Sequence, residues 1–313
     1  MSTPAQWLAR GRHLELADGR IFAVDLVPRE PRTPGAGPVL ILHGYPVSSW
    51  SFADAAELLA RERRVVLFDL LGFGFSAKPA DAAYSVFEHA DVAIAVARTF
   101  GLSRVHIWAH DMGASVATEL VARRERGLLP FEIASLALMN GGIYVEMSRP
   151  TLGQRMLMSR AGPALSRLAG RSRTIFLSQM RRTFGRQPAP GQLESIWAMQ
   201  SRDDGVFRMP ATIRFMQERA RFRRRWIGAL RRIDLPVLVG WGASDPVTPL
   251  AVAERLARET PGSELVAWPG LGHYPQVEDP PQVAAAVAAF MTRVEGVPGK
   301  DRAALDAEGP IGD

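Results

Sequence analysis

The sequence predicts an α/β fold with a mostly parallel, eight-stranded sheet, helices on both faces of the sheet and an inserted helical cap. Two observations predict it. Short apolar runs that suit buried strands alternate with longer runs of helical spacing, up to residue 139 and again from residue 236. Between these two regions the alternation stops, and arginines and apolar residues recur at helical spacing.

We therefore expect a core made of residues 1–143 and 236–295, a cap made of residues 144–235, and a disordered polar tail at 296–313. The chain has 313 residues, of which 47% are hydrophobic. It is long enough for one large core with an inserted lobe.

The individual elements follow from the same patterns in chain order. Strands are predicted where apolar residues run together or alternate, at 13–16, 21–27, 39–42, 65–68, 105–109, 133–139, 236–241 and 264–268. Core helices are predicted at 51–61, 87–100, 250–258 and 281–294, with a further helix directly after residue 111. Right-handed crossovers between parallel strands would place these helices on both faces of the sheet.

Composition excludes several classes of protein. There is no cysteine, which rules out disulfides, thiolate metal sites and cysteine nucleophiles and fits a reducing compartment. The N-terminal segment, with Arg10 and Arg12, lacks the apolar run of a signal peptide, and no stretch reaches the ~18–20 apolar residues of a membrane span. We expect a soluble, cytoplasmic protein without a metal or other cofactor.

The net charge of +6 is unevenly distributed, because residues 149–234 contain nineteen arginines, no lysine and five acidic residues. Such a basic cap could attract anionic substrates, phospholipid head groups or nucleic acid. A solvated face is the simpler explanation, since the whole chain has only two lysines, Lys78 and Lys300, and so favours arginine generally. We expect no nucleic-acid binding and at most a weak contact of the Arg-rich cap with a membrane surface.

The segment 105–117 predicts a buried strand, a sharp turn and a helix, with Asp111 at the turn. Small residues, Ala109 and Gly113, stand two positions before and after it, as a strained strand-to-helix elbow requires. Taken alone, an aspartate that caps the following helix is the commoner explanation. A carboxylate at an elbow instead indicates attack on an sp³ carbon, because the resulting alkyl ester is stable until water cleaves it.

Each of the last two predicted strands is followed by a residue that could complete this site, Asp245 and His273. Either could be an ordinary loop residue on its own. Since the carboxyl ends of parallel strands meet at one edge of a sheet, we expect both side chains to lie near Asp111. The chain order is then nucleophile, acid and base. Asn140 occupies the other position where an acid could stand, and it cannot stabilise an imidazolium by charge.

The loop after strand 39–42 reads His43-Gly44-Tyr45-Pro46 and can direct the amide N–H of Tyr45 toward Asp111. Met112, at the start of the next helix, offers a second N–H. Two such donors form an oxyanion hole, which would hold an oxygen of Asp111 during alkylation and the tetrahedral oxyanion during hydrolysis. A tight structural turn is the alternative explanation of the His43-Gly44 pair.

These motifs resemble the epoxide hydrolase and haloalkane dehalogenase branch of the α/β-hydrolase superfamily, over roughly residues 10–295. A closer similarity is to the mesoderm-specific transcript family. The stretches that carry it are Asn140-Gly141-Gly142-Ile143, Arg149-Pro150, residues 221–230, Asp245-Pro246-Val247 and residues 273–280. The resemblance implies a hydrolase fold and an Asp-His-Asp triad, and it leaves the substrate open.

The sequence departs from both better-known relatives at the leaving-group site. Epoxide hydrolases of this branch open the ring with two cap tyrosines, and residues 149–234 contain none; Tyr144 is the nearest. Haloalkane dehalogenases hold the halide with a tryptophan directly after the nucleophile, where this chain has Met112. The candidate donors are then Tyr144 for an epoxide and Trp197 or Trp226 for a halide, although buried tryptophans more often only pack.

We therefore expect a hydrolase with an aspartate nucleophile and an alkyl-enzyme ester, acting with water on a small or medium, apolar to amphipathic substrate. An epoxide is the first choice and an alkyl halide the second. Ester or lactone hydrolysis would require Ser at position 111. A catalytically silent protein that binds a lipid or a partner is the alternative from another class, and the sequence leaves the oligomeric state open.

Overall fold

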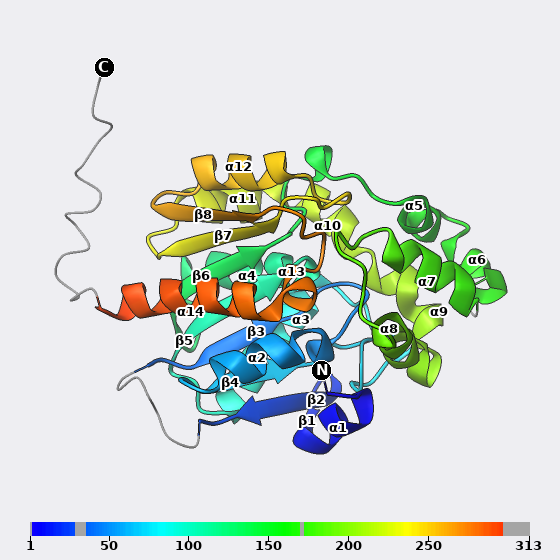
Figure 1. Ribbon diagram of the computed structural model, residues 1–313, viewed down its shortest axis with the longest axis horizontal. Helices are drawn as coiled ribbons and strands as arrows, with labels where there is room; N and C mark the ends of the chain where they lie inside the picture. The colour runs from blue at the N-terminus through cyan, green and yellow to red at the C-terminus, as the bar shows by residue number, and fades with distance from the viewer. Residues whose placement is uncertain (1, 29–35, 170–171, 297–313) are drawn as a thin grey trace.

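The computed structural model describes residues 2–28, 36–169 and 172–296 (Figure 1). It confirms the predicted α/β fold class, with an eight-stranded, mostly parallel sheet between layers of helices. The predicted tail at 296–313 lies outside these residues, except for Gly296, which ends the last helix.

The sheet has the strand order β1-β2-β4-β3-β5-β6-β7-β8. β2 pairs antiparallel with β1 and with β4, and the other neighbouring strands are parallel. The strands are β1 (Arg12–Leu16), β2 (Gly19–Leu26), β3 (Val39–Leu42), β4 (Val65–Phe68), β5 (Arg104–His110), β6 (Glu132–Met139), β7 (Val237–Gly242) and β8 (Ser263–Trp268). All eight predicted strands are present, each within two residues of its predicted bounds.

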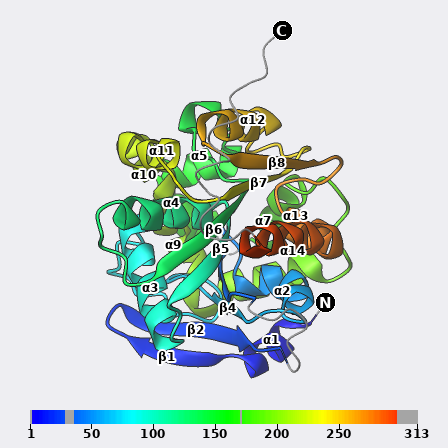
Figure 2. The ribbon, with the colours of Figure 1, turned by 90° about the vertical axis from the view of Figure 1, so that its left-hand side faces the viewer.

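Helices cover both faces of the sheet (Figure 2). One apolar core includes residues of α3 (Val86–Thr99), α4 (Met112–Arg124) and α12 (Leu250–Glu259), and the other includes α2 (Ala53–Leu59) and α14 (Pro280–Gly296). β3, β4 and β7 are therefore buried along their whole length. This explains why their sequences are continuously apolar and do not alternate.

An N-terminal helix, α1 (Pro4–Arg10), is absent from the sequence-based prediction. Its start carries recognisable signals, since Thr3 and Gln6 form a capping box and Pro4 occupies the first helical position. Trp7 anchors the helix, because its side chain is buried and its indole N–H donates to Ser49 Oγ at 3.1 Å.

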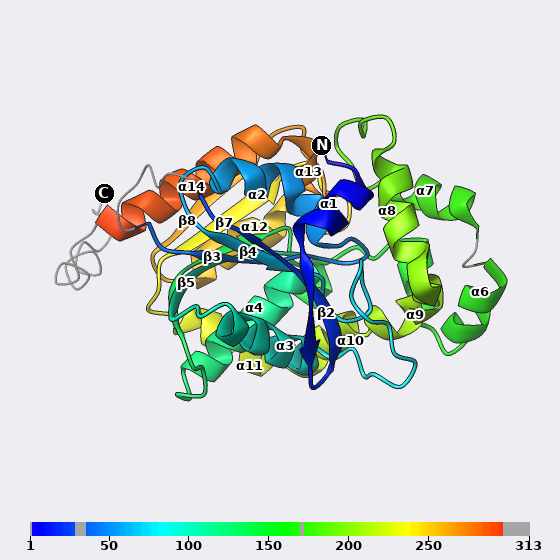
Figure 3. The ribbon, with the colours of Figure 1, turned by 90° about the horizontal axis from the view of Figure 1, so that it is seen from below.

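The residues of the predicted cap, 144–235, form helices in two groups. A lobe beyond the ends of the strands, on the right in Figures 1 and 3, contains α5 (Leu152–Met158), α6 (Gly162–Ala169), α7 (Arg173–Arg181), α8 (Gln192–Ser201) and α9 (Gly205–Thr212). The helices α10 (Phe215–Arg221) and α11 (Arg223–Arg231) instead lie against α4. Short helices at Ser49–Phe52, Val145–Met147, Arg202–Asp204 and Pro275–Glu278 (α13) complete the structure.

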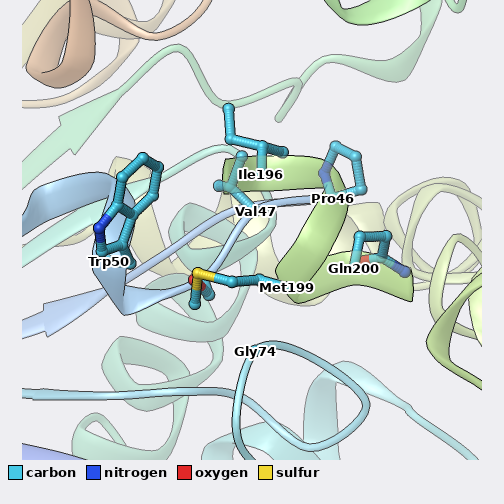
Figure 4. A pocket seen from close by; sticks show the side chains of 8 residues that line it. Pro46, Val47, Trp50, Gly74, Ile196, Met199 and Gln200 are labelled. Carbon is cyan, nitrogen blue, oxygen red and sulfur yellow. The ribbon is translucent and has the colours of Figure 1, made fainter. Parts of the chain in front are cut away.

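Helix α8 of the lobe packs against the loop that follows β3. The residues that line this contact are Pro46, Val47, Ser48, Trp50, Gly74, Ile196, Met199 and Gln200 (Figure 4). The space between these residues is too small to hold a water molecule. Ser48 Oγ lies 3.6 Å from the sulfur of Met199. This dry contact fixes the lobe over the carboxyl ends of the strands.

Candidate active site

The loop between β5 and α4 is a strained elbow. Asp111 has φ 47° and ψ −109°, a conformation that L residues rarely adopt. Small neighbours make the turn possible: a Cβ atom at Gly113 would lie 2.2 Å from the carbonyl oxygen of Leu42, and one at Gly44 would lie 2.8 Å from Cβ of Asp111. The structure therefore holds Asp111, 6% exposed, at the carboxyl edge of the sheet.

The turn after β3 brings a hydrogen-bond donor to this carboxylate. The N–H of Tyr45 donates to Oδ2 of Asp111 at 3.1 Å. Met112 is the first residue of α4, so its N–H has no partner within the helix. The two predicted oxyanion donors thus flank Asp111, one across the turn and one along the chain.

His43 has a structural function in that turn. Its Nδ1 lies 2.9 Å from the carbonyl oxygen of Gly44, and its Nε2 accepts from the N–H of Leu70 at 2.9 Å. Burial lowers the pKa of His43, which keeps the ring in the neutral form that these two bonds require. The ring joins the oxyanion turn to the loop after β4.

His273 and Asp245 meet at the same edge. Nδ1 of His273 lies 2.7 Å from Oδ2 of Asp245. Burial lowers the pKa of His273, but the charge of Asp245 and this hydrogen bond raise it, and the net effect is a raised pKa. Burial likewise raises the pKa of Asp245, whereas His273, Thr248 and Asn140 lower it to below its ordinary value. The pair therefore favours an ionised aspartate beside the imidazole.

Asn140, at the end of β6, holds this pair in place. Its amide nitrogen donates to Oδ2 of Asp245 at 2.8 Å, and its oxygen accepts from the N–H of Gly242 at 3.1 Å. An aspartate at this position would place a second negative charge against Asp245. The other position where an acid could stand therefore supports Asp245, the predicted acid.

Arg219, a buried residue of α10, contacts the predicted nucleophile and was not predicted from the sequence. Its Nη2 donates to the backbone oxygen of Asp111 at 2.7 Å and lies 3.4 Å from Oδ1, and its Nε donates to Ser115 Oγ at 2.7 Å. The side chain is 4% exposed. A charge this deeply buried requires a partner of opposite charge, and Asp111 supplies it.

A small cavity of about 50 Å³ lies between the core loops and the lobe. The core contributes Tyr45, Pro46, Val247, His273 and Tyr274. The lobe contributes Thr151, Gln154, Leu157, Phe176, Gln179, Met180, Thr183 and Met209. Since this cavity touches His273 and is lined by many apolar side chains, it is the candidate binding site for a small apolar substrate.

Two of the three predicted leaving-group donors are bonded to other residues in the structure. The hydroxyl of Tyr144 donates to Oε2 of Glu259 at 2.7 Å. The indole N–H of Trp226 donates to Oε2 of Glu119 at 2.9 Å. Both donors are already engaged by carboxylates other than Asp111. Trp197 packs against Phe176 in the lobe, with ring centroids 5.2 Å apart, and its part in the reaction stays a prediction.

Two further properties concern the residues that the structure describes. They contain no cluster of His, Asp or Glu side chains with the arrangement of a metal site. None of their helices combines the length and the apolar character needed to cross a bilayer.

The fold and the elbow together define an α/β hydrolase, and a family model described as alpha/beta hydrolase fold matches residues 37–280. The chain belongs to this family. LipZ of Mycobacterium tuberculosis is 35% identical to it over 300 residues, which cover 93% of this chain and 99% of LipZ. The mesoderm-specific transcript homolog protein of Homo sapiens is 36% identical over 286 residues, or 88% of this chain and 83% of that protein, which confirms the resemblance found in the sequence.

Solved structures agree with this assignment. Haloalkane dehalogenase DbeA from Bradyrhizobium elkani is similar with a TM-score of 0.76, over 91% of this chain and 98% of that chain, at 21% identity. At this identity the likeness shows the fold alone.

Proposed function

We propose that this α/β hydrolase cleaves a bond at an sp³ carbon, with Asp111 as the nucleophile and an epoxide as the substrate class. The observation that carries the proposal is a carboxylate at the elbow. Its Oδ2 accepts the Tyr45 N–H, and the cavity that touches His273 lies at the same edge of the sheet. A carboxylate in this position can form an alkyl ester that water later cleaves, which suits alkyl electrophiles and does not suit esters.

In the first step, Oδ1 of Asp111 attacks the carbon and the electron pair of the breaking bond leaves with the oxygen or halide. Oδ2 is held by the Tyr45 N–H, so Oδ1 is the oxygen with the weaker contact, 3.4 Å to Arg219. The product is an ester of Asp111. Pre-positioning of the carboxylate lowers the entropic part of the barrier.

In the second step, His273 takes a proton from water and the resulting hydroxide adds to the ester carbonyl of Asp111. The Tyr45 N–H then stabilises the tetrahedral oxyanion, and Asp245 stabilises the imidazolium. Collapse of this intermediate releases the alcohol product and restores the carboxylate.

The choice of an epoxide over a halide rests on the donors around the site. A departing halide is best solvated by strong N–H donors. Met112 has none in its side chain, and Trp226 donates to Glu119. The cavity wall includes Tyr45, whose phenol has an O–H group of the kind that a developing alkoxide needs as a donor, whereas the hydroxyl of Tyr274 donates to the carbonyl oxygen of Tyr45.

Isotope labelling tests the nucleophile. In a single turnover in H₂¹⁸O, with enzyme in excess over an epoxide, we expect unlabelled diol and one ¹⁸O atom in the peptide that contains Asp111. This follows because water attacks the ester carbonyl and the oxygen delivered to the substrate comes from the enzyme. Labelled diol in that first turnover would show direct attack by water and contradict the proposal. The control is Asp111→Asn, which should give no product and no labelled peptide.

A second measurement separates the two chemical steps. His273→Gln should still be alkylated but should not hydrolyse the ester, so that intact-protein mass rises by the mass of the substrate. Normal turnover in this variant would contradict the assignment of His273. A panel of epoxides and alkyl halides that leaves the wild-type mass unchanged in every case, with no product, would favour the silent binding protein.

A further inference from the structure

The side chain of Tyr45 is buried, with 3% of it exposed, and its hydroxyl has no hydrogen-bond partner within the part of the chain that the structure describes. Buried polar groups in folded proteins are almost always hydrogen-bonded, so an unpaired one calls for an explanation. A group supplied by a ligand is one such explanation.

The other three tyrosines provide an internal comparison. Their hydroxyls all donate: Tyr84 to the carbonyl oxygen of Pro79, Tyr144 to Glu259 and Tyr274 to the carbonyl oxygen of Tyr45. The chain has four tyrosines, so Tyr45 alone among them has an unused hydroxyl in this structure. The unpaired hydroxyl therefore belongs to the tyrosine whose backbone N–H donates to Asp111.

The surroundings of the ring leave this hydroxyl few protein partners. Two of its neighbours are the rings of Phe73 and Phe215, with centroids 6.2 and 6.0 Å away, and neither can accept a conventional hydrogen bond. Burial and the charge of Asp111 raise the pKa of Tyr45 well above the usual range of a phenol. The hydroxyl is therefore protonated throughout the physiological pH range.

Tyr45 is also fixed in place relative to the nucleophile. Its N–H donates to Asp111 at 3.1 Å, its carbonyl oxygen accepts from Tyr274 at 3.1 Å, and the residue lines the cavity that touches His273. An epoxide in a cavity of about 50 Å³ has its ring oxygen close to the cavity walls. Among the other polar side chains of that wall, the hydroxyl of Tyr274 donates to the carbonyl oxygen of Tyr45, and the threonine hydroxyls and glutamine amides are weak acids.

We propose that the hydroxyl of Tyr45 donates the proton to the leaving oxygen when Asp111 opens an epoxide, so that one residue acts on the nucleophile through its backbone and on the leaving group through its side chain. This proposal rests on the proposed function. It assigns the role that Tyr144, bonded to Glu259, does not fill.

Oδ1 of Asp111 forms a bond to one ring carbon, the C–O bond breaks, and its electron pair goes to the ring oxygen, which takes the proton of Tyr45. The products are a hydroxyalkyl ester of Asp111 and a tyrosinate. Hydrolysis of that ester to carboxylate and diol releases one proton from water by way of His273, and this proton restores the Tyr45 hydroxyl.

The test compares Tyr45→Phe with Tyr274→Phe in single-turnover alkylation of Asp111, followed by intact mass. Tyr45→Phe keeps the backbone N–H and the ring and removes only the oxygen. We expect its alkylation by an epoxide to slow by ~10²–10⁴-fold, the usual contribution of a general acid. Alkylation by an alkyl iodide of matched size, which needs no proton, should slow by less than about tenfold. Tyr274→Phe should slow both reactions to a similar extent.

Thermal unfolding distinguishes a catalytic role of the Tyr45 hydroxyl from a structural one. Because the Tyr45 hydroxyl has no protein partner, Tyr45→Phe should unfold at the same temperature as the wild type or higher. Epoxide alkylation within about fivefold of the wild type, or an equal slowing of both substrates together with a lower unfolding temperature, would overturn the proposal for Tyr45 and leave Asp111 as nucleophile. Wild-type protein that is alkylated by no epoxide would overturn the proposed function and this proposal together.

Discussion

At the scale of single residues, the proposed base, His273, depends on how Asp245 is held. Its two oxygens accept five hydrogen bonds, from His273 Nδ1, the Asn140 amide, the Thr248 hydroxyl and the N–H groups of Val247 and Thr248. This network fixes the carboxylate in one orientation and compensates for its burial. The charge it carries is what raises the pKa of His273 against the opposite effect of burial.

A pH profile tests this relation. His273 can accept a proton from water only when it is neutral, so hydrolysis of the Asp111 ester should slow as the pH falls through a pKa above the ordinary 6.5. In Asp245→Asn that acid limb should move to lower pH, and the plateau rate should fall by as much as ~10⁴-fold, the loss known for a triad acid. Decay of the alkylated enzyme across pH 5 to 9, followed by mass, measures both. An unchanged profile and rate would mean that another carboxylate serves His273.

The residues at strand ends could be predicted, and those that depend on packing could not. Asp111, Asp245 and His273 each follow a strand, and topology brings the ends of parallel strands together. Arg219 gives no such signal among the nineteen arginines of residues 149–234. Its one sequence clue is that it shares the buried face of α10 with Phe215, four residues earlier.

At the scale of elements, Glu119 joins α4 to α11. Both of its oxygens are bonded, to Arg225 at 2.7 and 2.8 Å, to Arg123 at 2.9 Å and to the indole of Trp226 at 2.9 Å. The carboxylate is 1% exposed, so these donors replace water entirely. The tryptophan that the sequence offered as a leaving-group donor thus attaches a helix of the predicted cap to the core.

Trp226→Phe should therefore affect stability and spare turnover. Loss of one hydrogen bond to a buried carboxylate that keeps both arginines should cost about 1–2 kcal/mol of the free energy of unfolding. Urea denaturation measures this loss, and kcat for an epoxide and for an alkyl halide should stay within about twofold of the wild type. Unchanged stability with a specific loss of halide turnover would reinstate Trp226 as a halide donor.

At the scale of the whole molecule, the cavity is formed by the core and the lobe together. Core loops provide its reactive side and α5, α7 and α9 provide the opposite wall. Two arginines at the C-terminal end of α11 also pair with acidic residues of the core, Arg231 with Glu259 at 2.8 Å and the C-cap residue Arg232 with Glu125 at 3.0 Å. Part of the basic charge of residues 149–234 is therefore neutralised there. Contact of the lobe with a membrane surface stays a prediction.

The size of this cavity should set substrate preference. Met180, at the lobe wall, is 5% exposed, and Met180→Ala would enlarge the cavity. We expect the kcat/KM ratio for a phenyl-substituted epoxide over a methyl-substituted one to rise at least ~10-fold, within the range that one or two methylenes can give. Met199→Ala is the matched control, since Met199 is equally buried but lies in the dry contact with the loop after β3. An equal shift in both variants would show general loosening and contradict a role for the cavity.

Residues that interact at the candidate active site lie far apart in the sequence. Tyr45 reaches Asp111 across 66 residues, and Arg219 reaches it across 108. A cut after β6 would leave the proposed nucleophile and its amide donor on one fragment and the proposed base, its acid and the buried arginine on the other. Neither fragment could turn over substrate, and re-association of the two would be reported by catalysis itself, which makes the enzyme a natural candidate for a split reporter.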